Sequence, residues 1–549
     1  MNWQKNIVLV AIGIVLWMLI VEWSEFSDQQ PTDAMVIDQQ SETPYEQVPS
    51  SRQSPSSTLP TLDDSPVEPL LAFDNQIVRV TTDVFDITID TFGGDIVDVK
   101  LLKYLTEMEE EGGQPITLLS RSDGIEFIAE SGFLNGIGAN KGDWKPTFST
   151  ASSSYQLLEG QQQLNVDLVY QQQGIEFIKR FEFTESDYRV GLRYIINNNS
   201  GSPWSATFFG QFRRDSHVPQ TDFSTGMKPF LGAAIREEDD NYARYNFDDI
   251  EDKAVKSSIK GGWLAFVQHY FVTAWVPPQD QKNRFSLWKS GDLYFMAVIG
   301  EKINLAPGAT GEYKVDFYVG PKDQAVLKEL SKYLDSTIDY GFLWMLAKPI
   351  FATLEFIHDM VGNWGWAIIL LTILIKLILY PLSATSLKSM GKMRTLQPEM
   401  QRIKELYGDD RQKAGQEQMA LFKKHKVNPL GGCFPMLLQM PVFIALYWVL
   451  SESVEIRHSP WIFWIQDLSA KDPLFILPLI MGGSMFLMQK LQPTPADPMQ
   501  AKVFKWMPIV FTFFFLMFPS GLVLYWTVNN LLSILQQWIV NRQLAAPKG

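Results

Sequence analysis

The sequence predicts a multidomain membrane protein, with an N-terminal anchor helix, a large all-β domain and a C-terminal bundle of transmembrane helices. Apolar runs of membrane-spanning length occur at the N-terminus and again after about residue 340. Between them, roughly 250 residues alternate apolar and polar side chains with the period of two that is typical of strands. One apolar run contains Lys376, and a charge at that depth normally faces a bundle interior or a wet cavity.

Composition excludes several classes of function. The chain has 549 residues and a formal net charge of −14, which argues against DNA as a ligand. Its one cysteine, Cys433, excludes an intramolecular disulfide, and its five scattered histidines form no metal-ligand pattern. No phosphate loop, nucleophile elbow or zinc signature is present. We therefore expect no enzymatic activity, no cofactor and no bound metal.

The first 72 residues are expected to form an anchor and a tether. Ile7–Val21 is apolar and is flanked by tryptophans at interface depth, so residues 1–24 are expected to span a membrane. A cleavable signal peptide is the alternative, but Glu22–Phe26 offers no cleavage site between small residues. Residues 25–72 are rich in Gln, Ser, Pro, Thr and acidic residues, and such a segment buries too little apolar surface to fold.

Residues 73–321 are expected to form a large β-sandwich, because strand patterns dominate and few helical patterns occur. Gly93-Gly94 marks a turn between two of the strands. The expected strands are Ile77–Thr81, Phe85–Asp90, Ile96–Leu101, Gly174–Phe183, Arg189–Asn197, Gly262–Val276, both arms of a hairpin within Phe285–Ile299, and Tyr313–Val319. A sugar-binding cleft is one use for the aromatic and acidic residues of this region, but a structural role is the simpler interpretation.

Residues 322–358 are expected to form helices at the membrane surface. Val326–Ile338 carries apolar residues at helical spacing on one face, with charged residues opposite. Phe342–Ile357 is apolar but contains Lys348-Pro349, which predicts a break in a helix that lies in the interface.

Residues 359–542 are expected to hold five transmembrane helices, which makes six spans with the anchor. Trp506–Val540 has no charged residue, but one helix of that length would measure ~52 Å against a hydrocarbon thickness of ~30 Å. Phe518–Gly521 is therefore expected to break it. The expected spans are about 360–382, 433–451, 473–489, 504–518 and 520–540.

Loop charges predict the orientation of these spans. Segment 383–430 holds ten Lys and Arg against five Asp and Glu, and its apolar spacing predicts a helical hairpin. A basic loop of this kind favours the cytoplasm. Six spans then place both termini in the cytoplasm and the β-domain in the periplasm, whereas five spans would place the C-terminus outside.

Polar side chains inside the predicted spans indicate a cationic, amide-lined cavity. Thr372 and Lys376 belong to the first span after the β-domain, and Gln439 belongs to the next. The last span contributes Asn529, Asn530 and Ser533. The alternative for Lys376 is that its side chain extends past Leu382 to the cytoplasmic headgroups.

Several motifs make this sequence resemble a known family closely. They are TFGGDIVDVKLLKY (Thr91–Tyr104), GGWLAFVQHYFVTAWVP (Gly261–Pro277), NWGWAII (Asn363–Ile369), MRTLQPEMQ (Met393–Gln401), VNPLGGCFPMLLQMPVFIALY (Val427–Tyr447), DPMQ (Asp497–Gln500) and FPSGLVLYW (Phe518–Trp526). The chain resembles the YidC-type membrane protein insertases of Gram-negative bacteria over nearly its full length. This resemblance implies a non-catalytic outer domain of the sugar-mutarotase supersandwich type. It also implies a groove between the helices that opens to the cytoplasm and to lipid but is closed outward.

The resemblance also implies roles for individual residues. Lys376 matches the position of the groove's positive charge, which is commonly arginine, with Thr372 one turn earlier and Gln439 facing it. Lysine departs from that pattern because its compact ammonium cannot grip a carboxylate bidentately. The residues that match the apolar path of a nascent helix are Phe443, Met481, Phe514 and Trp526. The implied partners are nascent membrane proteins, the Sec translocon, the ribosome with the signal recognition pathway, and the phospholipid bilayer of the bacterial inner membrane.

Two other classes of function remain open from the residues alone. A secondary transporter with a cationic site would be expected to show an internal repeat among its spans, and none is visible. A membrane-anchored periplasmic glycan-binding protein would depend mainly on the β-domain.

Overall fold

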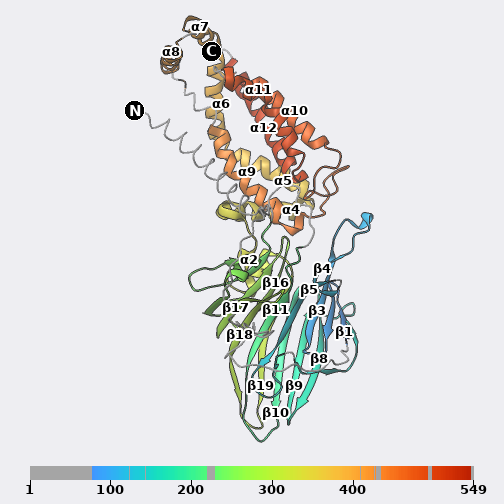
Figure 1. The fold of residues 1–549 in the computed structure, drawn as a ribbon. Coiled ribbons are helices and arrows are strands. Elements are labelled where there is room, and N and C mark those ends of the chain that lie inside the picture. Colours follow the sequence, from blue (N-terminus) through green and yellow to red (C-terminus); the bar gives the residue numbers. More distant parts are fainter. Residues whose placement is uncertain are drawn as a thin grey trace, which may run out of the picture. The chain divides into compact units, whose positions relative to one another are not determined.

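The computed structural model describes residues 77–545, with the exception of residues 123, 143, 219–228, 408–409, 426, 428–433 and 493–497. The predicted anchor and tether lie outside the described residues. The described chain forms an all-β domain, drawn from blue to yellow-green in Figure 1, followed by a helical region drawn from yellow to red. The expected order of a large all-β domain followed by a helical region is therefore confirmed.

Two sheets make up the β-domain within the described residues. The ten-stranded sheet has the order β14 (Val255–Lys260), β17 (Lys282–Ser290), β18 (Leu293–Leu305), β11 (Trp204–Arg214), β5 (Ile125–Leu134), β4 (Pro115–Ser122), β3 (Asp95–Leu105), β2 (Phe85–Asp90), β1 (Ile77–Thr81) and β7 (Ser154–Gln156). The nine-stranded sheet has the order β13 (Ala243–Tyr245), β12 (Gly232–Ile235), β15 (Leu264–Val267), β16 (Phe271–Val276), β19 (Thr310–Pro321), β10 (Arg189–Asn198), β9 (Ile175–Thr184), β8 (Gln163–Gln172) and β6 (Ser149–Thr150). A short helix, α2 (Phe247–Asp252), follows β13.

The alternating sequence pattern directs one face of each sheet into a shared core. In β9 and β10, buried residues alternate with half-exposed ones over ten positions each. Phe133 of β5 packs edge-on against Tyr194 of β10 and Trp204 of β11, with ring centroids 4.9 and 5.4 Å apart. Because these rings come from both sheets, aromatic packing holds the two layers of the sandwich together.

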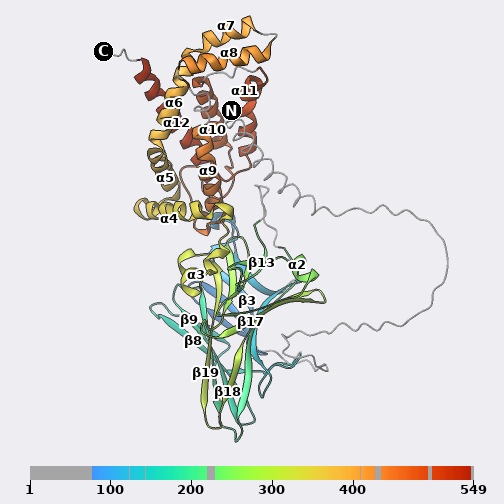
Figure 2. The same cartoon turned by 90° about the vertical axis from the view of Figure 1, so that its left-hand side faces the viewer.

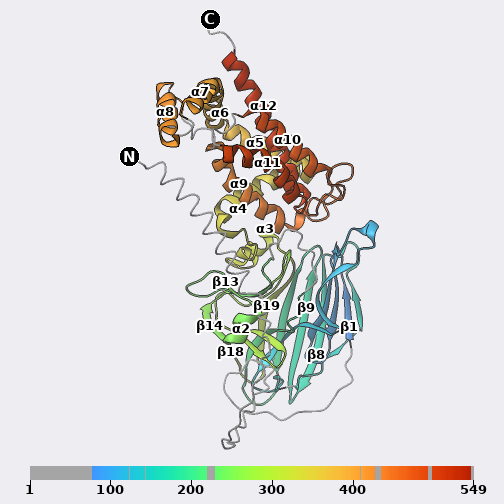
Figure 3. The same cartoon turned by 45° about the horizontal axis from the view of Figure 1, so that its top comes forward.

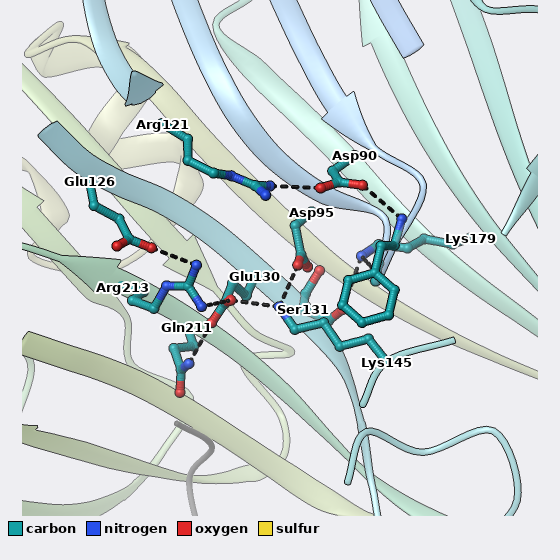
Figure 4. Close-up of polar contacts among 12 residues, drawn as sticks. Asp90, Asp95, Arg121, Glu126, Glu130, Ser131, Lys145, Lys179, Gln211 and Arg213 are labelled. Atoms are coloured by element: carbon teal, nitrogen blue, oxygen red, sulfur yellow. Dashed lines mark hydrogen bonds and ion pairs between the residues drawn. The ribbon is translucent and has the colours of Figure 1, made fainter. Parts of the chain in front are cut away.

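A network of buried charges also lies in the core. Figure 4 shows Lys145 between Asp95 and Glu130, and its ammonium lies 2.6 Å from a carboxylate oxygen of each. Glu130 also accepts a hydrogen bond from Gln211 and pairs with Arg213 at 3.2 Å. These charges thus find partners within the protein, as buried charges require.

Lys179 joins the two sheets, and no described carboxylate lies at hydrogen-bond distance from it. It belongs to β9 of the nine-stranded sheet, is fully buried, and donates to the carbonyl of Ser131 in β5 at 3.0 Å (Figure 4). It also donates to the carbonyl of Gly93, between β2 and β3 of the ten-stranded sheet, at 3.1 Å. The predicted turn at Gly93-Gly94 makes room for it. A Cβ on Gly94 would lie 2.9 Å from Lys179 Cδ, and the φ of +64° there also favours glycine.

Two predictions about element boundaries are wrong. Gly262–Val276 is a hairpin of β15 and β16 rather than one strand, because the amide of Gln268 bonds to the carbonyl of Phe271 and closes a turn. The helix expected over Val326–Ile338 is α3 (Gln324–Leu330) followed by a short 3₁₀ segment, Leu334–Thr337. Tyr333 adopts a φ of +67°, which no continuous α-helix allows.

The break expected at Lys348-Pro349 is also absent, since α4 (Trp344–Val361) runs through it. Pro349 is the sixth residue of α4, so it removes the hydrogen bond that its amide would have made to the carbonyl of Met345, but it does not end the helix. The hydroxyl of Thr353 donates to the carbonyl of Pro349.

The remaining helices are α5 (Trp364–Ile378), α6 (Tyr380–Thr395), α7 (Gln397–Leu406), α8 (Arg411–Lys424), α9 (Phe434–Glu452), α10 (Ile476–Leu491), α11 (Pro498–Phe515) and α12 (Ser520–Ala545). The break between the last two helices covers residues 516–519, so it overlaps the predicted Phe518–Gly521 but begins two residues earlier. Figure 2 shows α7 and α8 side by side as a hairpin, whose core contains Leu396, Leu421 and Phe422.

The first predicted span ends earlier than expected, at Ile378 rather than Leu382. Helices α5 and α6 meet at an angle of 70° around Leu379, where Pro381 begins the new helix and removes an amide that would continue the old one. No single helix among the described residues is both long and apolar enough to cross a bilayer, whereas α5 and α6 together reach that length and composition.

Candidate functional site

Helix α5 buries its polar residues together with part of its apolar surface, and its exposed face is apolar. The side chain of Asn363 caps its first turn by accepting a hydrogen bond from the amide of Trp366. Thr372 and Lys376, four residues apart on one face, are both buried. Thr372 donates to the carbonyl of Ile368, one turn earlier. The exposed side chains of this helix are Trp366, Leu370, Leu374, Leu377 and Ile378.

The ammonium of Lys376 points into the bundle. It donates a 2.7 Å hydrogen bond to Ser533 Oγ on α12, and the residue is 6% exposed. No described carboxylate lies within ion-pair distance of it. Ser533 in turn donates to the carbonyl of Asn529 at 2.7 Å. The lysine is thus held by a hydroxyl and keeps its charge unpaired.

Gln439 and Asn529 extend this polar site to a third helix. Asn529 Nδ2 donates to Gln439 Oε1 at 3.4 Å, which links α12 to α9. We call Lys376, Ser533, Asn529 and Gln439 the Lys376 cluster. It gathers residues from α5, α9 and α12, and Figure 3 shows these helices in one bundle.

Asn530 lies on α12 beside Asn529, but it contacts α10 instead of α9. Its amide donates to Ser484 Oγ of α10 at 3.1 Å, and Ser484 donates to the carbonyl of Met481. Neighbouring positions on an α-helix are rotated by about 100°, so Asn529 and Asn530 cannot share a partner helix. Asn530 therefore fastens α12 to α10 outside the Lys376 cluster.

The four residues expected along the apolar path occupy different environments. Phe443 of α9 packs edge-on against Trp526 of α12, with ring centroids 4.6 Å apart. Phe514 of α11 is 56% exposed, but Met481 of α10 is completely buried. Phe443, Trp526 and Phe514 belong to a continuous aromatic group, whereas Met481 packs into the helical core.

Sequence reasoning missed several residues of this region. Ser484 carries the only hydroxyl in α10. A lone polar residue in an apolar run could have identified it as a contact between helices. Phe515 and Tyr525 are buried between Phe443 and the rest of the aromatic group. Nothing in an already aromatic-rich segment distinguishes these two rings from their neighbours.

The connection from α9 to α10 docks onto the turn between α11 and α12. The amides of Ser520 and Gly521 bond to the carbonyls of Ala470 and Leu468, at 2.7 and 2.9 Å. An isolated antiparallel bridge pairs Lys471 with Pro519. We call this contact the outer seam. Backbone groups thus satisfy one another at this end of the bundle.

Comparison with known proteins identifies the family of this chain. A family model described as the YidC periplasmic domain matches residues 77–353, and a model described as the 60Kd inner membrane protein matches residues 356–547. The chain belongs to the YidC family. Relatives from Cellvibrio japonicus and Saccharophagus degradans, both called membrane protein insertase YidC, are 45% and 48% identical to it, over 99% of this chain and 99% of each relative.

Solved structures of similar chains include a YidC insertase and a sugar-mutarotase relative. An active YidC insertase with its first transmembrane domain resolved is 19% identical, with a TM-score of 0.38, over 84% of this chain and 92% of that one. A galactose mutarotase-like protein from Lactobacillus casei is 10% identical, with a TM-score of 0.30, over 44% of this chain and 99% of that one.

YidC-family membership gives the chain an inner-membrane location and a periplasmic domain. The expectation of a non-enzymatic protein agrees with the family, whose members are insertases and chaperones. Full-length similarity to insertases does not favour the transporter or the glycan-binding alternative.

Proposed function

We propose that this chain inserts nascent membrane proteins into the inner membrane. In this proposal the Lys376 cluster is a polar binding site for the client inside the helical bundle. The observation that carries the proposal is the ammonium of Lys376, which is buried in the bundle, bonded to Ser533 and without an ion-pair partner among the described residues. A buried charge is costly in a membrane protein, so its presence without a carboxylate partner favours a functional role.

Helix α5 with the first residues of α6, and helices α9 to α12, form the membrane-embedded part in this proposal, with the anchor as a sixth span and both termini in the cytoplasm. The apolar outer face of α5 suits contact with lipid, while Thr372 and Lys376 face inward. The basic hairpin of α7 and α8 then lies in the cytoplasm. Nascent chains would reach it from the ribosome and the signal recognition pathway, either directly or together with the Sec translocon.

The Lys376 cluster lowers the cost of moving a polar segment into the bilayer. Each unsatisfied backbone group in hydrocarbon costs several kcal/mol, and the amides and hydroxyls of the cluster supply alternative partners. Lys376 attracts acidic residues of the client's outer segment. The client's apolar segment passes along Phe443, Trp526 and the exposed Phe514 into lipid.

Release into lipid needs no nucleotide in this proposal. Burial of an apolar helix yields roughly 25 cal/mol per Å² of apolar surface. The membrane potential adds about 2.3 kcal/mol per charge for each 100 mV. Both sources of free energy are present at the membrane itself.

Reconstitution with charge variants tests the electrostatic step. Proteoliposomes that contain only this protein are given a short single-span client with an acidic outer segment, and insertion is measured by protease protection. We expect Lys376→Glu to slow insertion at least tenfold and Lys376→Arg to support it. A client whose acidic residues are replaced by amides should be much less sensitive to the charge reversal.

Lys302→Glu, an exposed position on β18, is the control for the same change in net charge and should insert the client normally. Equal insertion by Lys376→Glu and the wild type would contradict the role given to Lys376. Failure of both proteins to insert any client would contradict the insertase function itself.

A further inference from the structure

The loop that connects α9 to α10 presents an aromatic residue in an unusual way. Phe463 is 76% exposed, which is the highest exposure of any described large hydrophobic residue of the chain. Its φ of +53° lies in the left-handed region, where aromatic residues are rare. We call Ser459–Lys471 the Phe463 loop. An exposed aromatic in this backbone conformation is retained only if the surrounding structure holds it there.

Backbone hydrogen bonds hold the loop in shape. The amide of Trp461 bonds to the carbonyl of Ile465 at 3.0 Å, and the amide of Leu468 bonds to the carbonyl of Ser459 at 3.0 Å. Gln466 Nε2 donates to the carbonyl of Phe463 at 2.6 Å. The loop therefore closes on itself around its tip, and Phe463 is displayed by a structured turn.

Two further contacts fasten the loop to the bundle. Asn363, the cap of α5, donates to the carbonyl of Pro460 at 2.9 Å, and the Trp461 ring lies so close to Gly365 that a Cβ there would be 2.1 Å from it. At its other end, the loop contributes Leu468 and Ala470 to the outer seam. The position of Phe463 relative to α5 and α12 is thus fixed from both sides.

The surface around Phe463 is apolar and carries almost no charge. Trp464 stacks on Phe463, with the two rings tilted by 13°, and its indole nitrogen donates to Asp472 at 3.0 Å. The only charged residue between Ser459 and Ala470 is Asp467, whose carboxylate accepts from the amide and hydroxyl of Ser469. Exposed apolar residues at the same end of the bundle are Trp366, Leu474 and Phe475.

We infer that the Phe463 loop inserts into the bilayer, with Phe463 and Trp464 at the boundary between headgroups and acyl chains of the periplasmic leaflet. This inference rests on the membrane-embedded bundle of the proposed function. The exposed apolar surface of the loop continues along α10 through Leu479 and Ile480 to Phe486 and Leu487. Aromatic rings prefer this boundary region. The tip of the loop, Trp461–Gln466, carries no charge and can enter it, while the exposed Lys471 lies at the end of the loop. The loop anchors the outer end of the bundle at a fixed depth.

Depth-dependent fluorescence quenching tests the inference on the full chain. Cys433 is the only cysteine, so Cys433→Ser gives a background for single labels. An environment-sensitive fluorophore is attached at Phe463→Cys or, as a second position at the same end, at Phe475→Cys. The protein is reconstituted in phosphatidylethanolamine–phosphatidylglycerol vesicles with nitroxides placed near the headgroup or deep in the acyl chain.

Two further label sites calibrate the experiment. Phe486→Cys is about 15 Å along α10 from its first residue, at 1.5 Å per residue, and reports the bilayer interior. Leu158→Cys, exposed in the β-domain, reports water. We expect the labels at 463 and 475 to be quenched at least twofold more strongly by the shallow nitroxide than by the deep one. The label at 486 should show the opposite order, and the label at 158 should respond to neither.

Lipid quenching at 486 combined with water-like behaviour at 463 and 475 would overturn the inference and leave the proposed function standing. Self-quenching at 463 that grows with protein density, without lipid quenching, would show a second copy on this surface and would also overturn it. Water-like behaviour at 486 as well would overturn both the inference and the membrane-embedded bundle on which it rests. Each labelled variant is first shown to insert the single-span client.

Discussion

Lys376 and Ser533 meet through a 2.7 Å hydrogen bond that joins α5 to α12. The serine also donates to the carbonyl of Asn529, so its oxygen accepts only from the lysine. Ser533→Ala leaves the charge in place but removes its acceptor. We expect a roughly twofold to thirteenfold slower insertion of a client with an acidic outer segment, since one hydrogen bond is worth about 0.5–1.5 kcal/mol.

Thr527→Ala provides the matched control for this change. Thr527 is buried on the same helix, and its hydroxyl donates to the carbonyl of Val523 rather than to the Lys376 cluster. Insertion by this variant should stay near the wild-type rate. If both alanine variants slow insertion equally, the effect belongs to α12 in general and not to the lysine.

Lys179 predicts a pH dependence for the stability of the β-domain. Burial lowers the pKa of Lys179 from its ordinary value of 10.5 to about 7. Between these values the unfolded chain binds a proton that the folded chain does not, so the free energy of unfolding rises as the pH rises from 7 toward 10.5, by at most about 1.4 kcal/mol per pH unit. Lys179→Met should remove this rise.

Hydrogen exchange of β5 and β9 in the full chain, measured between pH 7.5 and 9.5, checks this prediction after correction for the intrinsic exchange rate. The comparison uses the slope with pH, because the variant also leaves the carbonyls of Gly93 and Ser131 without their donor. Identical slopes in the two proteins would show that the amine is protonated in the folded state.

Alanine substitutions at Gly94 and Gly291 separate two costs in stability: the crowding of Lys179 and the strain of a positive φ. Both glycines have a positive φ, +64° and +60°, but a Cβ would meet Lys179 only at Gly94 and open space at Gly291. Gly291→Ala should cost about 1–2 kcal/mol from the left-handed backbone alone. Gly94→Ala should cost a further ~1–3 kcal/mol because of overpacking. Thermal unfolding of the two variants measures the difference, and equal costs would contradict the close approach.

Ser484 and Asn530 predict a measurable coupling between α10 and α12. Ser484→Ala leaves a buried amide without its acceptor, which costs about 1–3 kcal/mol. Asn530→Ala removes the same hydrogen bond from the other side. A double-mutant cycle in detergent-solubilised protein should therefore give a coupling of about 0.5–1.5 kcal/mol. Additive costs would indicate that the two side chains do not interact.

Features that depend on residues close together in the sequence were predictable from it. The strands around Gly93-Gly94 follow from alternation and a glycine turn, and the helix break at Phe518–Gly521 follows from length and a Pro-Ser-Gly run. The hairpin of β15 and β16 was not predictable in this way, because its turn at Gln268–Tyr270 contains no glycine, proline or asparagine.

Partners across helices were harder to predict. The sequence grouped Asn529 with Asn530, but the rotation of α12 sends one toward Gln439 and the other toward Ser484. Likewise, Met481 is completely buried and Phe514 is exposed, although both stand in apolar runs. Such differences depend on how each helix is rotated against its neighbours, and a pattern of polar and apolar residues fixes that rotation only approximately.

A bacterial inner membrane stores energy as a voltage, so a protein that admits polar groups to mid-depth must not conduct ions. At the outer seam, the backbone groups that pair Lys471 with Pro519 and Ser520 with Ala470 bond to each other rather than to water. In the proposed insertase, this seam would close the bundle to ions on the periplasmic side, while clients enter from the cytoplasm.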